Sequence, residues 1–276
     1  MTWKALGAAF PGALAEARLQ VHWAAQLVSA PGTSLLPKAA DDSHTNLGWD
    51  STLGVLVGRN AGPKSLRAAL VFEGLELLVL DGERERSSMR LAGRTLNQAL
   101  AWLGEEFAGD ASALTLPDLE MPPHAVGEGA PFSDAGTEAR IELAAWFANA
   151  FALIREVVAD EPGASPVRCW PHHFDVASLM TLDEGAGSEE ARSIGVGFSP
   201  GDGSYDQPYF YVTPWPYPDT GDLPPLANGA QWHRSGWTGA VLTADSLISV
   251  PLAEQQRTAR EALGGALTAC REILGA

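Results

Sequence analysis

The stretch that decides the fold class is residues 66–82, LRAALVFEGLELLVLDG. Two short runs rich in Leu and Val, residues 66–72 and 75–80, are typical of β-strands. Asp81 and Gly82 suit the tight turn of a hairpin, because both residue types tolerate a positive φ. A third run, residues 52–58, precedes them. The sequence therefore predicts an antiparallel meander in the first half of the chain.

Helical periodicity surrounds this meander. Apolar residues recur at helical spacing in residues 12–30, where Pro31 and Gly32 are expected to end the helix, and again in residues 93–107, 137–159 and 251–274. Helices and strands come in runs rather than in strict alternation. This order predicts an α+β fold with antiparallel sheets in a meander-like arrangement and helices packed on one side. Two similar halves are one interpretation of the order.

The most plausible boundary lies in residues 109–136, which are rich in Pro and Gly and cannot continue a helix or a strand ladder. It separates a helix-plus-meander half, residues 1–108, from an aromatic- and His-rich half, residues 137–276. A single compact domain is the alternative.

Composition narrows the classes of partner. The formal net charge is −16, which disfavours nucleic acid and anionic membrane surfaces because both attract clustered Lys and Arg. The chain has two cysteines, too few for a disulfide framework. No stretch has the length of a membrane span. We expect a cytoplasmic protein that binds neither nucleic acid nor membranes.

A second informative stretch is residues 167–179, VRCWPHHFDVASL. Read as one strand with period two, it puts His173 and Asp175 on one face and Trp170 and His172 on the other. A histidine and a carboxylate side by side could bind a divalent metal, or act as a base and the acid that orients it. The alternative is structural: Asp175 caps backbone amides and His173 is an interior histidine.

Aromatic residues gather in the region that follows. They are interleaved with proline and with polar groups that can orient a ligand; the candidates are Asp202, Tyr205, Tyr209, Trp215, Trp232 and His233. Residues 197–201 match the G-x-S-x-G nucleophile pattern, but Pro200 lacks the N–H that its oxyanion hole requires. Pro200 and Gly201 instead predict a type II turn between two strands, residues 193–198 and 209–213. The aromatic rings could equally pack the end of a sheet.

Scattered residues also resemble a bacterial family known only as a domain of unknown function. They are Gln26, His44, Trp49, Ser165-Pro166-Val167, Phe174-Asp175, Pro200-Gly201, Pro208, Phe210-Tyr211 and Pro216. Where the family has His-Trp-Trp this chain has HTNLGW, and where the family has an aromatic stretch before Phe-Asp it has WPHH. The resemblance thus adds weight to His44 and Asp175 and does not extend to His172 or His173. It implies no reaction.

The leading hypothesis is a protein that binds a small polar or sugar-like ligand in an aromatic-lined pocket. Its ligand-binding residues would be His44, Trp170, His172, Asp202, Tyr205, Tyr209, Trp215 and Trp232. The alternatives are a hydrolase, with His173, Asp175 and His233 as catalytic residues that hold a metal-bound water or act as acid and base, and a protein-interaction module. The sequence does not decide whether the chain is an enzyme, whether a divalent metal is bound, or what its oligomeric state is.

Overall fold

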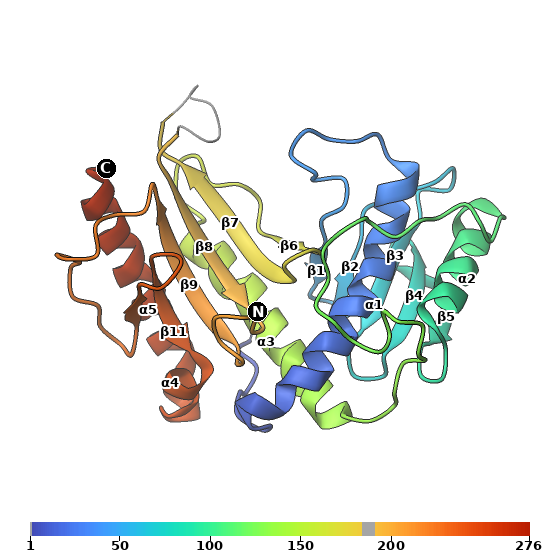
Figure 1. Cartoon of the computed structure of the whole chain (residues 1–276), viewed down its shortest axis with the longest axis horizontal. Helices are drawn as coiled ribbons and strands as arrows, with labels where there is room; N and C mark the ends of the chain where they lie inside the picture. Colours follow the sequence, from blue (N-terminus) through green and yellow to red (C-terminus); the bar gives the residue numbers. More distant parts are fainter. Residues whose placement is uncertain (1, 184–190) are drawn as a thin grey trace. The chain divides into compact units, whose positions relative to one another are not determined.

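A computed structural model describes residues 2–183 and 191–276 of the chain, which form two compact units (Figure 1). Unit 1 consists of Met1–Gly12, Asn149–Val167 and Asp175–Ala276, and unit 2 of Ala13–Ala148 and Arg168–Phe174. The expected connection, residues 109–136, falls inside unit 2, and the chain passes between the units within helix α3 (Thr137–Val157). Antiparallel sheets of five and six strands, with helices, confirm the α+β prediction.

Unit 2 contains the predicted meander. Its strands follow one another in the order β1-β2-β3-β4-β5, and every neighbouring pair is antiparallel. The bounds are β1 Gly48–Asp50, β2 Val55–Val57, β3 Arg67–Val71, β4 Glu76–Asp81 and β5 Arg84–Arg90. The hairpin turn at Asp81 and Gly82 is confirmed, with Asp81 paired to Arg84 and Gly82 at a φ of 62°.

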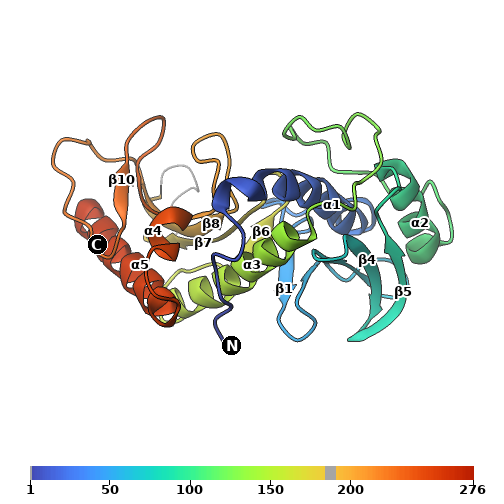
Figure 2. The same ribbon diagram turned by 90° about the horizontal axis from the view of Figure 1, so that it is seen from below.

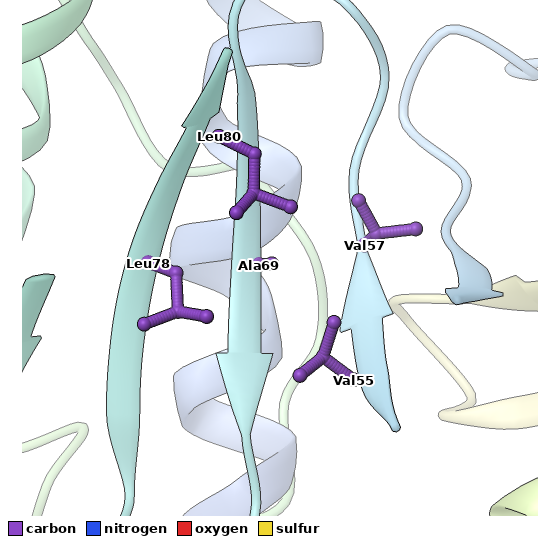
Figure 3. Close-up of a cluster of buried hydrophobic side chains, with 5 residues drawn as sticks. All are labelled: Val55, Val57, Ala69, Leu78 and Leu80. Atoms are coloured by element: carbon purple, nitrogen blue, oxygen red, sulfur yellow. The ribbon is translucent and has the colours of Figure 1, made fainter. Parts of the chain in front are cut away.

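Helix α1 (Leu14–Leu35) lies against one face of this sheet and beside helix α2 (Leu96–Ala108) (Figures 1 and 2). Gly58 marks the face toward α1, because a Cβ there would lie 2.5 Å from Val28 O. The opposite face carries a buried apolar cluster, drawn in Figure 3 with α1 behind the strands: Val55, Val57, Ala69, Leu78 and Leu80.

The expected end of the first helix at Pro31 and Gly32 is wrong, since α1 continues to Leu35. Gly32 serves close packing instead, because a Cβ at this position would lie 2.2 Å from His44 O. The helix ends where Leu36, the residue before Pro37, adopts extended angles. By contrast, α2 lies where a helix was predicted, in residues 93–107, and Thr95 and Gln98 form a capping box at its start.

Unit 1 contributes five strands to the larger sheet, in the order β10-β11-β9-β8-β7, and neighbouring strands are antiparallel. Their bounds are β7 Asp175–Thr181, β8 Ser193–Ser199, β9 Tyr209–Trp215, β10 Gln231–His233 and β11 Gly239–Thr243. The two strands expected on either side of the Pro200-Gly201 turn are therefore confirmed. Short helix α4 (Ala244–Ile248) follows β11.

Helix α5 (Leu252–Leu274) packs along β9, β8 and β11 (Figure 1). The face toward α5 carries Phe210 and Val212, whose carbonyl accepts a weak hydrogen bond from Cys270 Sγ. Alternation along β9 turns Tyr209, Tyr211 and Thr213 to the opposite face. The sheet of unit 1 thus has one apolar face, which includes Phe198 and Phe210, and one face that carries tyrosines and polar side chains.

Candidate functional site

The residues predicted to form one site are divided between the two units. Unit 1 contains Asp175, Asp202, Tyr205, Tyr209, Trp215, Trp232 and His233. Unit 2 contains His44, Trp170, His172 and His173. Each group owes its arrangement to the contacts within its own unit.

The single strand predicted across residues 167–179 is wrong at its centre. Strand β6 (Arg168–Trp170) ends before Pro171, and β7 begins at Asp175. The residues between them form a turn, which Phe174 N closes by donating to Trp170 O at 2.7 Å. Phe174 has a φ of 59°, outside the range of strand residues. His173 and Asp175 therefore do not share a strand face, and the period-two argument that paired them fails.

Side chains of α1 hold this turn in the core of unit 2. His22 Nε2 lies 2.8 Å from Pro171 O, and Gln26 Nε2 donates to the same carbonyl at 2.7 Å. The ring of Phe174 stacks on that of His22, with centroids 4.8 Å apart. Two buried polar residues of α1 thus satisfy a carbonyl that a continuous strand would have bonded to a neighbour.

Asp202 organises the loop between β8 and β9. One carboxylate oxygen accepts from the amides of Ser204 and Tyr205, at 2.7 and 3.2 Å, and the other accepts from Tyr209 Oη at 2.5 Å and Ser199 Oγ at 3.3 Å. Burial, and after it the hydrogen bond to Asp202, raises the pKa of Tyr209, so this hydroxyl stays protonated and donates. At the start of this loop Oγ of Ser199, the last residue of β8, accepts from Gly201 N at 3.1 Å.

His233 joins this group from β10 rather than from the loop position expected for it. Its Nδ1 lies 3.0 Å from Tyr205 Oη, and its Nε2 lies 2.7 Å from Ser235 O. A carbonyl only accepts, so Nε2 carries the proton and Nδ1 accepts from Tyr205. Both ring nitrogens are engaged, which leaves no lone pair for the base that the hydrolase hypothesis needs.

The rings around His233 form a contiguous aromatic wall, made of Tyr205, Tyr209, His233 and Trp237. Trp237 stacks on His233 with centroids 4.2 Å apart and lies parallel to Tyr209 at 6.5 Å. Tyr205 contacts Tyr209 at 4.9 Å and His233 at 5.5 Å. Trp237 Nε1 donates to Ser204 Oγ at 3.2 Å, which ties the fourth ring to the Asp202 loop. Trp237 was part of the aromatic concentration in the sequence, but nothing there singled it out.

Asp175 has a different partner from the one predicted. It accepts a hydrogen bond from Tyr211 Oη at 2.5 Å. The side chain of Tyr211 reaches Asp175 across β8 at Gly197, where a Cβ would lie 2.2 Å from Tyr211 Cζ. Burial and the charge of Asp175 raise the pKa of Tyr211 well above its ordinary value. The sequence signal for this pair is a glycine in register with a tyrosine on the next strand.

The two other predicted tryptophans of unit 1 are not part of the aromatic wall. Trp232 pairs with Ala240 and therefore points to the opposite sheet face from His233, and its Nε1 donates to Pro224 O at 2.7 Å. Trp215 is 43% exposed and contacts Tyr217 edge-on at 5.2 Å. Successive side chains of a strand point to opposite faces of the sheet, which separates Trp232 from His233 although they are adjacent in sequence.

In unit 2 the predicted residues form only a short run of rings. His172 contacts His173 at a centroid distance of 4.2 Å and Trp170 at 6.2 Å. Burial lowers the pKa of His172, and the neighbouring His173 lowers it further. His44 lies elsewhere, with Nδ1 accepting from Ala39 N at 3.3 Å. None of these contacts pairs a histidine with a carboxylate.

Within residues 2–183 and 191–276, no group of three or more His, Cys, Asp and Glu side chains is arranged to hold a metal ion. Among the helices of the same residues, none combines the length and apolarity that crossing a bilayer requires.

Comparisons with protein families, with curated proteins and with solved structures find no match to this chain. The resemblance to an uncharacterised bacterial family therefore stays a prediction, and the functional argument depends on the geometry of the chain itself.

Proposed function

We propose that the chain binds a small polar, sugar-like ligand against the aromatic wall of unit 1. The observation that carries this proposal is the fixed arrangement of Tyr205, Tyr209, His233 and Trp237, whose ring centroids lie 4.2 to 6.5 Å apart. Hydrogen bonds to Asp202, Ser204 and Ser235 orient the rings before any ligand arrives.

The rings of the aromatic wall are held in place before a ligand binds, and this favours a role in binding over a role in packing alone. Tyr205, His233 and Trp237 are partly exposed, while Tyr209 is buried behind them at 4% exposure. Flat rings that are already held in place offer contact area to the C–H face of a sugar at little cost in side-chain entropy. The carboxylate of Asp202 accepts four hydrogen bonds within the chain, so its role is to hold the loop that carries these rings.

The test is a fluorescence titration of the full chain with a panel of neutral mono- and trisaccharides. Binding against Trp237 should change the tryptophan emission saturably for at least one member. Trp237→Ala should abolish the response or weaken binding at least about fivefold, since a stacked aromatic contact contributes about 1 kcal/mol.

Trp102→Ala is the matched control, because Trp102 is also half-buried but lies on α2 in the other unit. It should leave the titration unchanged. No saturable response across the panel, or an equal loss in the two variants, would count against the proposal.

A further inference from the structure

A hollow of about 550 Å³ opens in unit 2 beside the sheet face that carries Val57, and Gly58 and Leu36, the residue that follows α1, also line it. Its lining includes Gly48 and Val57 from the sheet, and its polar side chains include Asn46, Arg59, Arg67 and Arg168. This volume is within the range of small-molecule sites in proteins. Every lining residue belongs to unit 2.

Strand register explains why the arginines converge. Gly48 pairs with Val57, and Val57 with Ala69, so these residues form one row across the face. Arg67 is two residues before Ala69 on the same face. Gly58 N donates to Ala68 O at 2.9 Å, which continues the ladder and brings Arg59 opposite Arg67.

Arg168 enters the same face from the other side. Leu47 and Cys169 exchange backbone hydrogen bonds of 2.9 Å in an antiparallel bridge. The residue after Leu47 therefore lies beside the residue before Cys169, so Gly48 and Arg168 are neighbours. Because Gly48 has no side chain, this part of the hollow stays open: a Cβ there would meet only Val57 Cγ1, at 3.8 Å.

The charge of the hollow is opposite to that of the chain. Three arginines and no Asp or Glu line it, in a chain with a formal net charge of −16. None of the ion pairs among the described residues involves Arg59 or Arg67. Arg67 Nη2 donates to Gly82 O at 2.7 Å, which orients its guanidinium. Like charges held together around a cavity favour an anion between them.

Asn46 is a second, independent indication of a ligand. The residue is 3% exposed and lines the hollow, and its Oδ1 is buried without a hydrogen-bond partner among the described residues. Buried amide oxygens are normally bonded. A hydroxyl group of a bound molecule would satisfy this acceptor.

We propose that this hollow binds a small hydroxylated organic anion. The guanidinium groups of Arg59, Arg67 and Arg168 hold its phosphate or carboxylate, for which the planar arginine fork is suited, and Asn46 accepts from a hydroxyl. The site is independent of the aromatic wall, which belongs to the other unit, so either proposal can fail without the other.

Isothermal titration calorimetry on the full chain tests the site with glycerol 3-phosphate, glycerate, inorganic phosphate and glycerol, at constant ionic strength set with sodium chloride. At least one of the two organic anions should bind saturably and glycerol should not; the tighter one identifies the phosphate or the carboxylate as the preferred group. No binding of either anion would overturn the proposal. Inorganic phosphate binding as tightly as glycerol 3-phosphate would overturn the role of Asn46.

Variants locate the binding. Arg59→Gln and Arg67→Gln should each weaken the preferred anion at least about tenfold, the loss expected for a hydrogen bond to a charged group. Gly48→Leu should fill the hollow and abolish binding, while Arg84→Gln, an exposed arginine outside the lining, should bind like wild type. Arg59 is exposed, so its replacement tests the site without disturbing the core. Unchanged affinity in Arg59→Gln and Gly48→Leu would overturn the assignment.

Discussion

Acidification should destabilise the chain through His22, a buried histidine of α1. Its side chain stacks on Phe174 and its Nε2 lies 2.8 Å from Pro171 O, with the residue 6% exposed. Burial lowers the pKa of His22 from 6.5 to about 4; the hydrogen bond to Pro171 opposes this effect, and the positive charge of Arg18 adds to it. The imidazole is therefore neutral in the folded chain at neutral pH.

The sign of the effect follows from the two states. In the unfolded chain His22 takes up a proton near pH 6.5, whereas in the folded chain it does so only near pH 4. Between these values the unfolded state binds more protons, so the free energy of unfolding falls as the pH falls from 6.5 to 4. At 1.36 kcal/mol per pKa unit the full loss is about 3 kcal/mol, and most of it is reached by about pH 4.5.

Urea unfolding of wild type and His22→Gln between about pH 7.5 and 4.5 measures this loss. The His22→Gln variant should be less stable at neutral pH, because Gln cannot stack on Phe174, but its stability should fall by about 2 to 3 kcal/mol less over the range. Leu27→Ala, at a buried position of the same helix, controls for destabilisation alone and should keep the wild-type pH dependence. A His22→Gln curve parallel to that of wild type would refute the reasoning.

Two further predictions concern glycines whose missing side chain is filled by a neighbour. Gly197→Ala should displace the Tyr211 ring by overpacking and lower the free energy of unfolding by about 1 to 3 kcal/mol. Tyr211→Phe should lower it little further in that background if the two residues act through one contact, and a double-mutant cycle by denaturant unfolding measures this. Gly32→Ala should destabilise the chain by a similar amount because its Cβ would meet a backbone carbonyl, whereas Gly264→Ala, also helical but with nothing within 4 Å, should stabilise it by about 0.5 to 1 kcal/mol. Thermal melts of the two helical variants that moved in the same direction would contradict the packing argument.

Local signals in the sequence predicted most of the elements. The helix in residues 93–107, the Asp81-Gly82 turn and the apolar periodicity of α3 and α5 are formed by residues close together in sequence, so short stretches of sequence are enough to predict them. The Pro200-Gly201 turn was predicted for the same reason, and Gly201 has the positive φ that it requires.

The errors occurred where distant residues override a local pattern. Residues 167–179 alternate like a strand, but Pro171 and Phe174 are held by His22 and Gln26, about 150 residues earlier in the chain. The two hydrogen bonds to the Pro171 carbonyl compensate for the interrupted ladder. No window around residue 171 contains that information.

The candidate sites show the same limit. Asp202, Tyr205 and Tyr209 were predicted among the ligand-binding residues and His233 among the catalytic ones, because the aromatic and polar composition of this region is visible along the chain; contacts within unit 1 join the four. The arginine hollow was not predicted. Arg59, Arg67 and Arg168 belong to separate stretches of the sequence without a common motif, and only the strand register brings them together.

Gly197 and Gly48, one on each sheet, differ in what occupies the space that a side chain would fill. At Gly197 the missing Cβ is replaced by the Tyr211 ring, so the opening is filled and fixes the Tyr211–Asp175 pair. At Gly48 the nearest atom to an added Cβ would be Val57 Cγ1 at 3.8 Å, and three arginines line the hollow that this glycine borders. A strand glycine lowers sheet stability in either case. At Gly197 this loss of stability is compensated by internal packing. At Gly48 the compensation must come from a bound ligand, so the Gly48→Leu variant decides between a ligand site and a packing gap.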